Sequence, residues 1–405
     1  MKRYLCSIII GLVVLLSIGT YYVKVASSAS GLPTFSFKTI EGSDKELDPV
    51  IVQATLENNN LYEPLTIESN MTTYGHDRSL WSDRNDVQIE RLIKKHRSFM
   101  RGKDFIDSFY EDDDFLAYAS VNNEYTKSGK MEAEFDIGVL EKKDEDETSF
   151  RIDFPHQERL MNMEVRDVQL IHSKLQVLTM NDVDSSDDKQ TKEVHLYTID
   201  LAKKKVVNDK TLVSETFTYP NQVDFEMPVN TAPSQPNNMI LFSMIKGVNH
   251  EEGEYEEKLK ESKLFSYQYD TEKLTTIKGD KKESLNLDIA RSGYTDGKSL
   301  YAIDFTSGKY QLKTFDISSG ALTNDIELNV AVGKEEANFV AIKNGRVYFL
   351  LGSGMGENLT YEPAQLLIAD LKTGKTLYKG ETIRHAADKK NEQKIGFIIS
   401  TLEVI

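Results

Sequence analysis

Short alternating runs of hydrophobic and polar positions extend over most of the chain. Residues 34–40 and 64–68 alternate with a period of two, which is typical of strands that bury one face. Residues 115–119 and 347–351 are continuous apolar runs rich in aromatic and branched side chains, and runs this short favour strands over helices. We therefore expect an all-β domain over residues 34–405.

Two segments depart from this pattern. Within residues 86–100, apolar positions such as Ile89 and Leu92 have helical spacing among charged residues, and Asp86 is suited to cap the N-terminus. We predict one amphipathic helix there. Residues 251–263 are mostly charged, and we predict that they form an insertion between two strands.

A hydrophobic leader precedes the domain. Lys2 and Arg3 come before an apolar run at positions 4–23 that is interrupted only by small or hydroxyl residues, and this run is long enough to cross a hydrocarbon core of ~30 Å as a helix. Basic residues stay on the cytoplasmic side. We therefore expect residues 1–24 to anchor the chain in the cell membrane, with the main domain outside the cell after a linker at 25–33.

A cleaved signal peptide is the alternative interpretation of the leader. Residues 26–30 are small and of the kind that a signal peptidase accepts, and cleavage there would give a secreted protein. The single cysteine, Cys6, lies inside the leader. The domain is therefore expected to have no disulfide, cysteine-ligated zinc or thiol nucleophile.

A strand–turn unit recurs in the second half of the chain, where apolar–polar strands end in turn at Asp200, Asp270, Asp316 and Asp370. An aspartate can accept hydrogen bonds from the backbone N–H groups of the turn, and a glycine such as Gly374 supplies the positive φ that closes it. The spacings are 70, 46 and 54 residues, and the longest contains the insertion. They indicate a period of about 50, the length of a four-stranded propeller blade, so we expect the four aspartates at equivalent places in successive blades.

The best examples of this unit, residues 300–309 and 366–375, resemble the repeats of bacterial β-propellers of the quinoprotein-like class, in which Leu-Tyr-Ala-Leu-Asp is followed by a Thr-Gly-Lys turn. The resemblance covers the second half of the chain well and the first half poorly, and it implies a β-propeller. The docking tryptophans of that class are missing, because the only tryptophan is Trp81, and no residues match its quinone site. We therefore predict no cofactor.

The chain ends in another strand-like segment, residues 395–405. Because open sheet edges promote aggregation, we expect this strand to pair with strands from residues 34–68 and to close the ring. Counting that blade, we predict about seven four-stranded blades, within a range of six to eight, preceded by one transmembrane helix.

Charge and polar clusters limit the function. A net charge of -16 repels nucleic acid, so we expect no nucleic-acid partner. Oxygen ligands at Asp182, Asp184, Asp187 and Asp188 could hold Ca²⁺, but the central glycine and terminal glutamate of an EF-hand loop are missing, and a solvated hairpin tip is the preferred interpretation. The seven histidines are scattered without the spacing of a zinc helix.

No set of catalytic or cofactor-binding residues is evident, and catalysis needs converging groups. We therefore expect a non-enzymatic binding or scaffold protein of the cell envelope, anchored through residues 4–23, whose partner is another envelope protein or a wall component. Two alternatives stay open, because propeller sites assemble from distant blades. One is an extracytoplasmic hydrolase or oxidoreductase with its site in the propeller funnel, and the other is a sensory or accessory subunit of a membrane complex.

Overall fold

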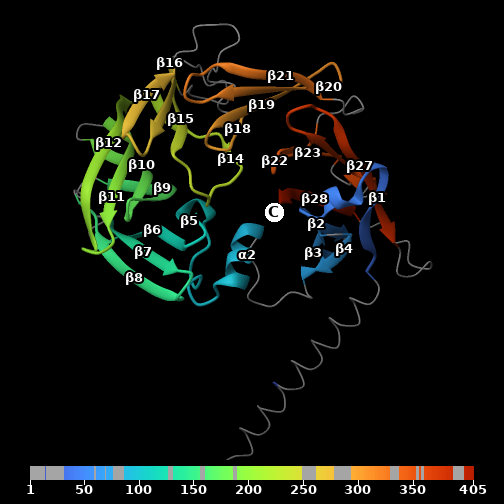
Figure 1. Cartoon of the computed structure of the whole chain (residues 1–405), viewed down its shortest axis with the longest axis horizontal. Helices are drawn as coiled ribbons and strands as arrows, with labels where there is room; N and C mark the ends of the chain where they lie inside the picture. The colour runs from blue at the N-terminus through green and yellow to red at the C-terminus, as the bar shows by residue number, and fades with distance from the viewer. Residues whose placement is uncertain are drawn as a thin grey trace, which may run out of the picture. The chain divides into compact units, whose positions relative to one another are not determined.

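The protein is known from a computed structural model, which describes Val14 and residues 32–58, 61–68, 70–75, 86–125, 131–155, 160–185, 189–248, 261–277, 293–328, 337–352, 355–356, 360–385 and 396–405. These residues form mainly β-strands (Figure 1), which agrees with the predicted all-β fold. None of the helices in this part of the chain has the length and apolar character needed to cross a bilayer. Apart from Val14, the expected anchor at residues 1–24 lies outside the described residues, as do Cys6 and most of the linker.

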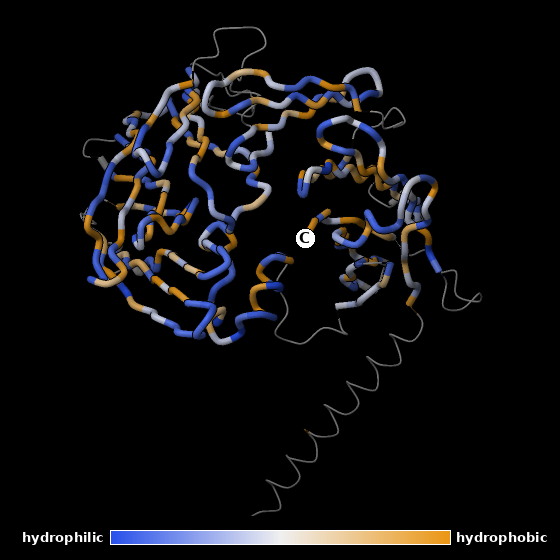
Figure 2. Tube along the Cα trace, in the orientation of Figure 1, coloured by the Kyte–Doolittle hydropathy of each residue, from blue (hydrophilic) through white to orange (hydrophobic). Residues whose placement is uncertain are grey.

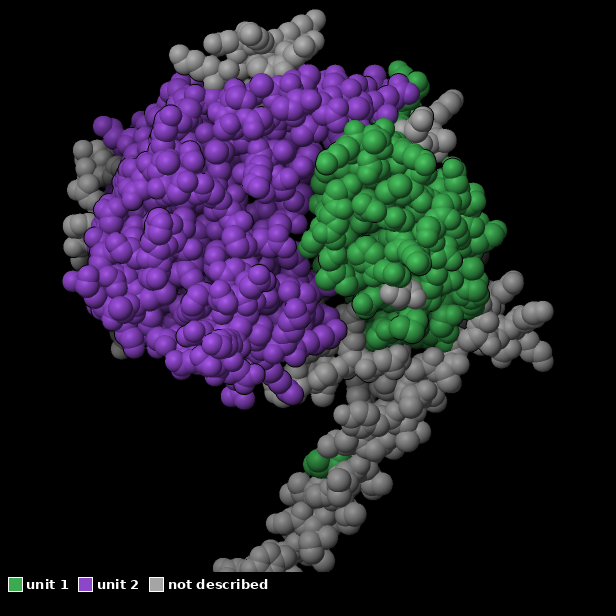
Figure 3. All heavy atoms as spheres, in the orientation of Figure 1, with its two compact units in different colours: residues 1–83, 307–309, 328–405 green, residues 84–306, 310–327 purple. Residues whose placement is uncertain are grey.

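The chain divides into two compact units (Figure 3). Unit 1 comprises residues 1–83, 307–309 and 328–405, and unit 2 comprises residues 84–306 and 310–327. Among the described residues, the two units together contain six sheets of four or five strands and one two-stranded ribbon.

Unit 2 contains four sheets that follow one another along the chain. Their strand orders are β5-β6-β7-β8, β12-β11-β10-β9, β13-β15-β16-β17 and β14-β18-β19-β20-β21. The strands are β5 (Phe109–Glu111), β6 (Phe115–Tyr125), β7 (Met131–Glu141), β8 (Asp146–Asp153), β9 (Leu160–Ile171), β10 (Lys174–Ser185), β11 (Lys189–Asp200), β12 (Lys205–Thr218), β13 (Asn221–Glu226), β14 (Val229–Asn230), β15 (Met239–Val248), β16 (Glu261–Gln268), β17 (Lys273–Ile277), β18 (Tyr294–Thr295), β19 (Ser299–Thr306), β20 (Lys309–Asp316) and β21 (Leu322–Leu328).

Neighbouring sheets of unit 2 share hydrophobic cores. Phe135 of β7 and Val177 of β10 belong to one core, and Leu196 of β11 and Phe242 of β15 belong to the next. Leu241 contributes to a third core with residues of β19 and β20. Successive side chains of a strand point to opposite faces, so the middle sheets are buried on both sides and the four sheets pack in sequence order. Figure 2 shows hydrophobic and hydrophilic residues alternating along many of these strands.

Unit 1 is built from two sheets and a ribbon. Their strand orders are β28-β2-β3-β4, β1-β27-β26-β23-β22 and β24-β25. The elements are β1 (Thr34–Gly42), η1 (Asp44–Leu47), β2 (Val50–Asn58), β3 (Leu61–Glu68), β4 (Met71–Tyr74), β22 (Phe339–Lys343), β23 (Arg346–Leu351), β24 (Met355–Gly356), β25 (Thr360–Tyr361), β26 (Gln365–Asp370), β27 (Thr376–His385) and β28 (Gly396–Val404).

Both sheets of unit 1 combine strands from opposite ends of the sequence. The last strand, β28, pairs antiparallel with β2, with Val404 opposite Val50. This confirms that the last strand pairs within residues 34–68. The first strand, β1, pairs antiparallel with β27, with Thr34 opposite His385. β28 therefore covers an edge of β2, and β1 covers an edge of β27. Both edges would be open if only consecutive strands had paired.

Three of the four predicted aspartate turns are equivalent. Asp200, Asp316 and Asp370 end β11, β20 and β26, which are the third of four consecutive strands in their sheets. Each carboxylate accepts a hydrogen bond from the backbone N–H three residues later, at 3.0, 2.9 and 2.8 Å respectively. The residue four positions after each aspartate has a positive φ, and these residues are Lys204 (50°), Gly320 (67°) and Gly374 (68°).

The prediction was wrong for Asp270. In that turn Gln268 pairs with Lys273, and the residue with positive φ is Glu272, at 50°. Gln268, four positions earlier, therefore takes the place of the aspartate. Asp270 lies inside the turn, where its backbone N–H donates to Asn238 Oδ1 at 3.2 Å. The strand ends two residues earlier than the sequence repeat indicates.

The two segments that depart from the strand pattern also differ from their predicted limits. The helix expected in 86–100 is α2 (Val87–Lys95), and Asp86 accepts hydrogen bonds from two backbone N–H groups of its first turn, at 2.8 and 3.0 Å. It ends before residue 100. Of the charged insertion expected at 251–263, residues 251–260 lie outside the described residues, and residues 261–263 belong to β16.

Candidate functional site: a polar pocket around His195

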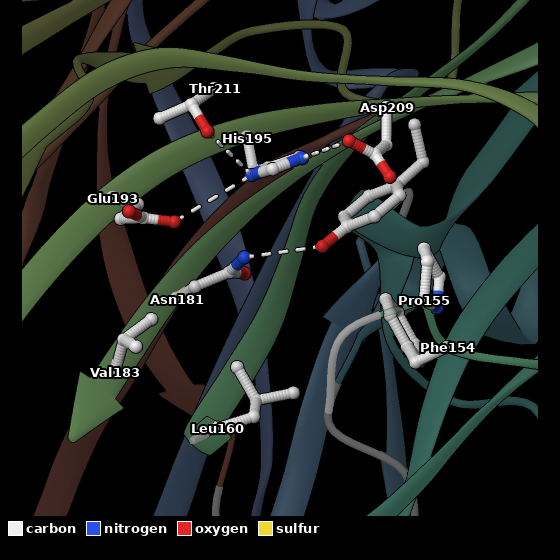
Figure 4. A pocket seen from close by; sticks show the side chains of 10 residues that line it. Phe154, Pro155, Leu160, Asn181, Val183, Glu193, His195, Asp209 and Thr211 are labelled. Atoms are coloured by element: carbon white, nitrogen blue, oxygen red, sulfur yellow. Dashed lines mark hydrogen bonds and ion pairs between the residues drawn. The ribbon is translucent and has the colours of Figure 1, made fainter. Parts of the chain in front are cut away.

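A polar pocket of about 380 Å³ lies on the sheet formed by β9 to β12, within unit 2. This volume is in the range of small-molecule sites. The lining residues come from these four strands and from the two residues that follow β8 (Figure 4), and they are Phe154, Pro155, Leu160, Asn181, Val183, Glu193, His195, Tyr197, Asp209 and Thr211.

The pocket continues one face of β11 beyond the hydrophobic core. Residues at alternate positions share a face of a strand. Ile199 and Tyr197 are buried in the core that this sheet shares with β5 to β8. The next two positions on the same face are His195 and Glu193, which are partly exposed. The apolar face of the strand therefore becomes polar where the pocket begins.

A β-bulge determines which side chains stand opposite His195. The register of β11 and β12 shifts so that Val194 pairs with Val213 and His195 pairs with Thr211. Leu212 is the extra residue, and it is buried in the core on the other face of the sheet. A bulge redirects the side chains that follow it. Here it gives His195 a hydroxyl neighbour instead of a leucine.

The imidazole of His195 lies between two carboxylates. Its Nδ1 is 3.7 Å from Glu193 Oε2 and 3.3 Å from Thr211 Oγ1, and its Nε2 is 3.7 Å from Asp209 Oδ1. Nε2 is buried and has no hydrogen-bond partner in the described part of the chain. The side chain of His195 is 12% exposed. A buried polar nitrogen without a partner is costly unless a ligand or water satisfies it.

Tyr197 forms the floor beneath His195. The two rings are stacked, with centroids 4.5 Å apart and an interplanar angle of 19°. Asn181 Nδ2 donates to the Tyr197 hydroxyl at 3.4 Å, and Thr179 Oγ1 donates to Asn181 Oδ1 at 2.7 Å. Because these contacts lie within one sheet, the position of His195 is fixed by packed and hydrogen-bonded neighbours.

The carboxylates set the electrostatics of the pocket. The His195 imidazole beside Glu193 lowers the pKa of that carboxyl, and Ser214, which donates to Glu193 Oε1 at 3.0 Å, lowers it further. Burial raises the pKa of Tyr197, so its hydroxyl stays protonated at neutral pH. The ten lining residues named above include two carboxylates and no lysine or arginine. The pocket therefore favours hydrogen-bond donors and positive charge.

Of the four aspartates considered for calcium, two lie in the described part of the chain. Asp182 and Asp184 lie on β10 opposite Lys192 and Gln190, and Lys192 Nζ is 4.0 Å from Asp182 Oδ1. Asp187 and Asp188 lie outside the described residues. No group of three or more His, Cys, Asp or Glu side chains in the described ranges is arranged to hold a metal ion.

The sequence analysis missed this pocket because it treated His195 as one of several scattered histidines. The neighbours of His195 come from three strands, and the bulge at Leu212 decides which of them face it. One local signal was available. Glu193 and His195 occupy alternate positions that continue the apolar face of Tyr197 and Ile199, and polar residues there indicate an interrupted core.

Comparisons with known proteins give only distant similarities. No protein-family model matches the sequence, and no curated protein matches it. Similar solved structures include the polysaccharide lyase Uly1, with 10% identity, a TM-score of 0.37 and coverage of 69% of this chain and 57% of the lyase. They also include the Dos1 propeller, with 11% identity, a TM-score of 0.24 and coverage of 65% and 58%.

A putative 6-phosphogluconolactonase from Bacteroides fragilis aligns over 90% of this chain and 100% of its own, with 8% identity and a TM-score of 0.26. In the alignment with the polysaccharide lyase Uly1, the chain spans a little more than half the length of the lyase. Propeller proteins are among these neighbours. The identities and scores are too low to transfer any property of those proteins to this chain.

Proposed function

We propose that this chain is a membrane-anchored, extracytoplasmic β-propeller that binds a small polar ligand of the cell envelope without catalysing a reaction. The pocket around His195 is the observation that carries the proposal. Its ligand is a wall component or a small group displayed by another envelope protein. The binding surface is a rigid sheet whose polar side chains converge from three adjacent strands.

The propeller architecture is supported by features inside each unit. In unit 2, four sheets follow one another and share cores between neighbours. In unit 1, β28 completes the first sheet of the chain and β1 extends the last. Exchange of strands between the two ends of a chain is what ring closure requires, since a ring has no free first or last blade.

The location is supported by the leader. Lys2 and Arg3 precede the apolar run at positions 4–23, and this order places the N-terminus in the cytoplasm and the domain outside. A domain without cysteine is compatible with export, because it cannot form wrong disulfides. Release of the domain after signal cleavage would leave its binding function unchanged.

The binding function is tested by filling the pocket. We expect the full chain in detergent to bind components of a soluble cell-wall digest, detected as line broadening of ligand NMR signals. Val183→Trp places a large ring in the pocket lining and should abolish the broadening. Val207→Trp, at a 38% exposed position of β12, is the matched control and should bind normally. Equal broadening with both variants would exclude this pocket as the binding site.

An extracytoplasmic hydrolase is the second candidate function, because the pocket places a hydroxyl, an imidazole and a carboxylate in sequence. Thr211 Oγ1 is 3.3 Å from His195 Nδ1, and Asp209 Oδ1 is 3.7 Å from Nε2. The 3.7 Å between Asp209 and His195 is longer than the contact that an orienting acid makes with a base in such a set of catalytic residues. Hydrolysis of a p-nitrophenyl ester that is lost in Thr211→Val would favour this candidate, and the absence of turnover above buffer would exclude it for esters.

A further inference from the structure

A short stretch of unit 2 has the opposite charge to the chain as a whole. The full sequence contains 49 Lys and Arg against 65 Asp and Glu. Residues 91–103, which cover the second half of α2 and the turns after it, include no acidic residue and six basic ones, and these are Arg91, Lys94, Lys95, Arg97, Arg101 and Lys103. Such a concentration of cations attracts anionic groups locally even where the net charge repels them.

Hydrophobic contacts hold this basic stretch on the sheet formed by β5 to β8. Ile89 and Leu92 of α2 are buried in one core with residues of β5, β6 and β7, and Phe99 and Met100 in the following turns belong to the same core. The backbone N–H of Met100 also donates to the His96 carbonyl at 3.0 Å. The basic side chains therefore project from a fixed backbone, which lowers the entropy cost of binding a partner.

Two of the six basic residues have partners inside the domain. Arg91 makes an ion pair with Glu111 of β5, and Lys103 Nζ donates to the Phe99 carbonyl. The other four are exposed and make no hydrogen bond or ion pair within the described part of the chain, and they are Lys94, Lys95, Arg97 and Arg101. These four side chains are available to an external anion.

The energetics of the helix explain only part of this arrangement. Cations in the last turn of a helix are favoured by the helix dipole, which accounts for Lys94 and Lys95. Arg97 and Arg101 lie beyond the end of the helix, where the dipole effect has fallen off. Their positions are therefore not explained by the stability of α2.

The surroundings of His96 show that cations gather here in space as well as in sequence. Burial lowers the pKa of His96, and the charges of Lys142 and Lys95 lower it further. The effect of Lys142 on the ring exceeds the opposing effect of Glu111. Lys142 directly follows β7, so a cation from the neighbouring sheet adds to those of the basic stretch.

We propose that the basic stretch, residues 91–103, binds a phosphodiester polymer of the cell wall. Lysine and arginine bind phosphate oxygens, and the exposed cations follow one another along a segment that a linear polyanion can track. None of the residues that line the pocket around His195 belongs to this stretch, so the polymer holds the domain at a second, separate surface. The choice of a wall polymer rests on the proposed position of the domain outside the membrane.

An anionic bilayer fits this surface less well than a single polymer chain. A bilayer is broad, so it would also approach the carboxylates that border the basic stretch. Asp104 follows the stretch directly and is exposed, and residues 144–147, which come two positions after Lys142, are all acidic and exposed. Like charges repel. A narrow polymer can contact the cations without meeting these carboxylates.

The test is the binding of fluorescently labelled inorganic polyphosphate to the full chain in nonionic detergent, followed by fluorescence anisotropy at several NaCl concentrations. The polymer should bind, with log K falling linearly with log salt because counterions are released. The triple variant Lys94→Gln/Arg97→Gln/Arg101→Gln should weaken binding at least tenfold and reduce the salt slope by about three. Glutamine preserves the helix propensity at position 94.

A matched control separates the basic stretch from the net charge. Lys203→Gln/Lys204→Gln/Lys205→Gln removes three exposed lysines of the same unit and changes the net charge equally, and it should bind normally. Val183→Trp, which fills the pocket, should also bind normally, so the two proposed surfaces can fail separately. Equal losses in the two triple variants, or no binding of polyphosphate to the wild type, would overturn the inference.

A fluorescent label distinguishes a bilayer as the occupant of this surface. Ser98→Cys, combined with Cys6→Ser, places an environment-sensitive fluorophore at an exposed position inside the basic stretch. For the full chain in nanodiscs of zwitterionic lipid, polyphosphate should shift the emission. Nanodiscs of anionic lipid without polyphosphate should give the unshifted emission. A shift caused by anionic lipid alone would assign the surface to the membrane and overturn the choice of a polymer.

Discussion

Phe35 of the first strand and Phe397 of the last strand stack on one another, with ring centroids 4.3 Å apart and an interplanar angle of 18°. They belong to different sheets of unit 1, and both are buried, with exposures of 1% and 0%. The two ends of the described chain thus meet inside one hydrophobic core. This contact therefore links the sheet completed by the pairing of β28 with β2 to the sheet extended by the pairing of β1 with β27.

Removal of the Phe397 ring should therefore destabilise unit 1 strongly. Truncation of a buried phenylalanine costs about 3–5 kcal/mol, from lost transfer free energy and a residual cavity. We expect Phe397→Ala to lower the free energy of unfolding, measured by urea titration, by an amount in that range. Ser400→Ala, at an exposed position of the same strand, should change the free energy of unfolding by less than about 1 kcal/mol. Similar midpoints for the two variants would show that β28 does not close the core.

The equivalent turns predict opposite effects of two substitutions. Gly374 has a φ of 68°, and a β-branched residue is strained there. Gly374→Val should therefore reduce stability by about 1–3 kcal/mol. Lys204 occupies the corresponding place after Asp200 with a φ of 50°, so Lys204→Gly should leave stability unchanged or raise it by up to about 1 kcal/mol. Urea unfolding measures both, and losses of equal size would refute the equivalence of the turns.

Asp167 of β9 should make stability depend on pH. Burial raises the pKa of Asp167 to about 6, although hydrogen bonds from the Tyr269 hydroxyl at 2.6 Å and from Gln169 Nε2 at 3.1 Å oppose the rise. The unfolded carboxyl ionises near pH ~4. Between these values the folded state binds more protons, so this group lowers stability as pH rises from about 4 to about 6.

Asp167→Asn should remove that slope. Relative to the variant, the wild type should lose on the order of 3 kcal/mol as pH rises through this interval. The measurement is the urea midpoint of both proteins from pH 4 to pH 7. Tyr269→Phe removes a hydrogen bond to the ionised form and should extend the loss to higher pH. A difference between wild type and Asp167→Asn that is constant over the interval would contradict the assignment.

Features that depend on nearby residues were predictable, and features that depend on register were not. Strand alternation, the Asp86 cap and the turn at Asp370 each involve a few consecutive residues, and sequence reasoning located them. The offset at Asp270 arose because Gln268 already ends the ladder with Lys273, which no local motif reveals. The pocket depends on the bulge that places Thr211 opposite His195, and such a shift between strands leaves no periodic trace in the sequence.

The central claim is that the pocket around His195 opens on the outer side of the membrane. It is tested most directly by a cysteine in the pocket lining, Val183→Cys, with Cys6→Ser removing the only native thiol. Thr271→Cys, at an exposed turn position, gives the reference rate. We predict that a membrane-impermeant maleimide labels both cysteines in intact cells, more slowly at position 183. Labelling of both cysteines only after lysis would contradict the account.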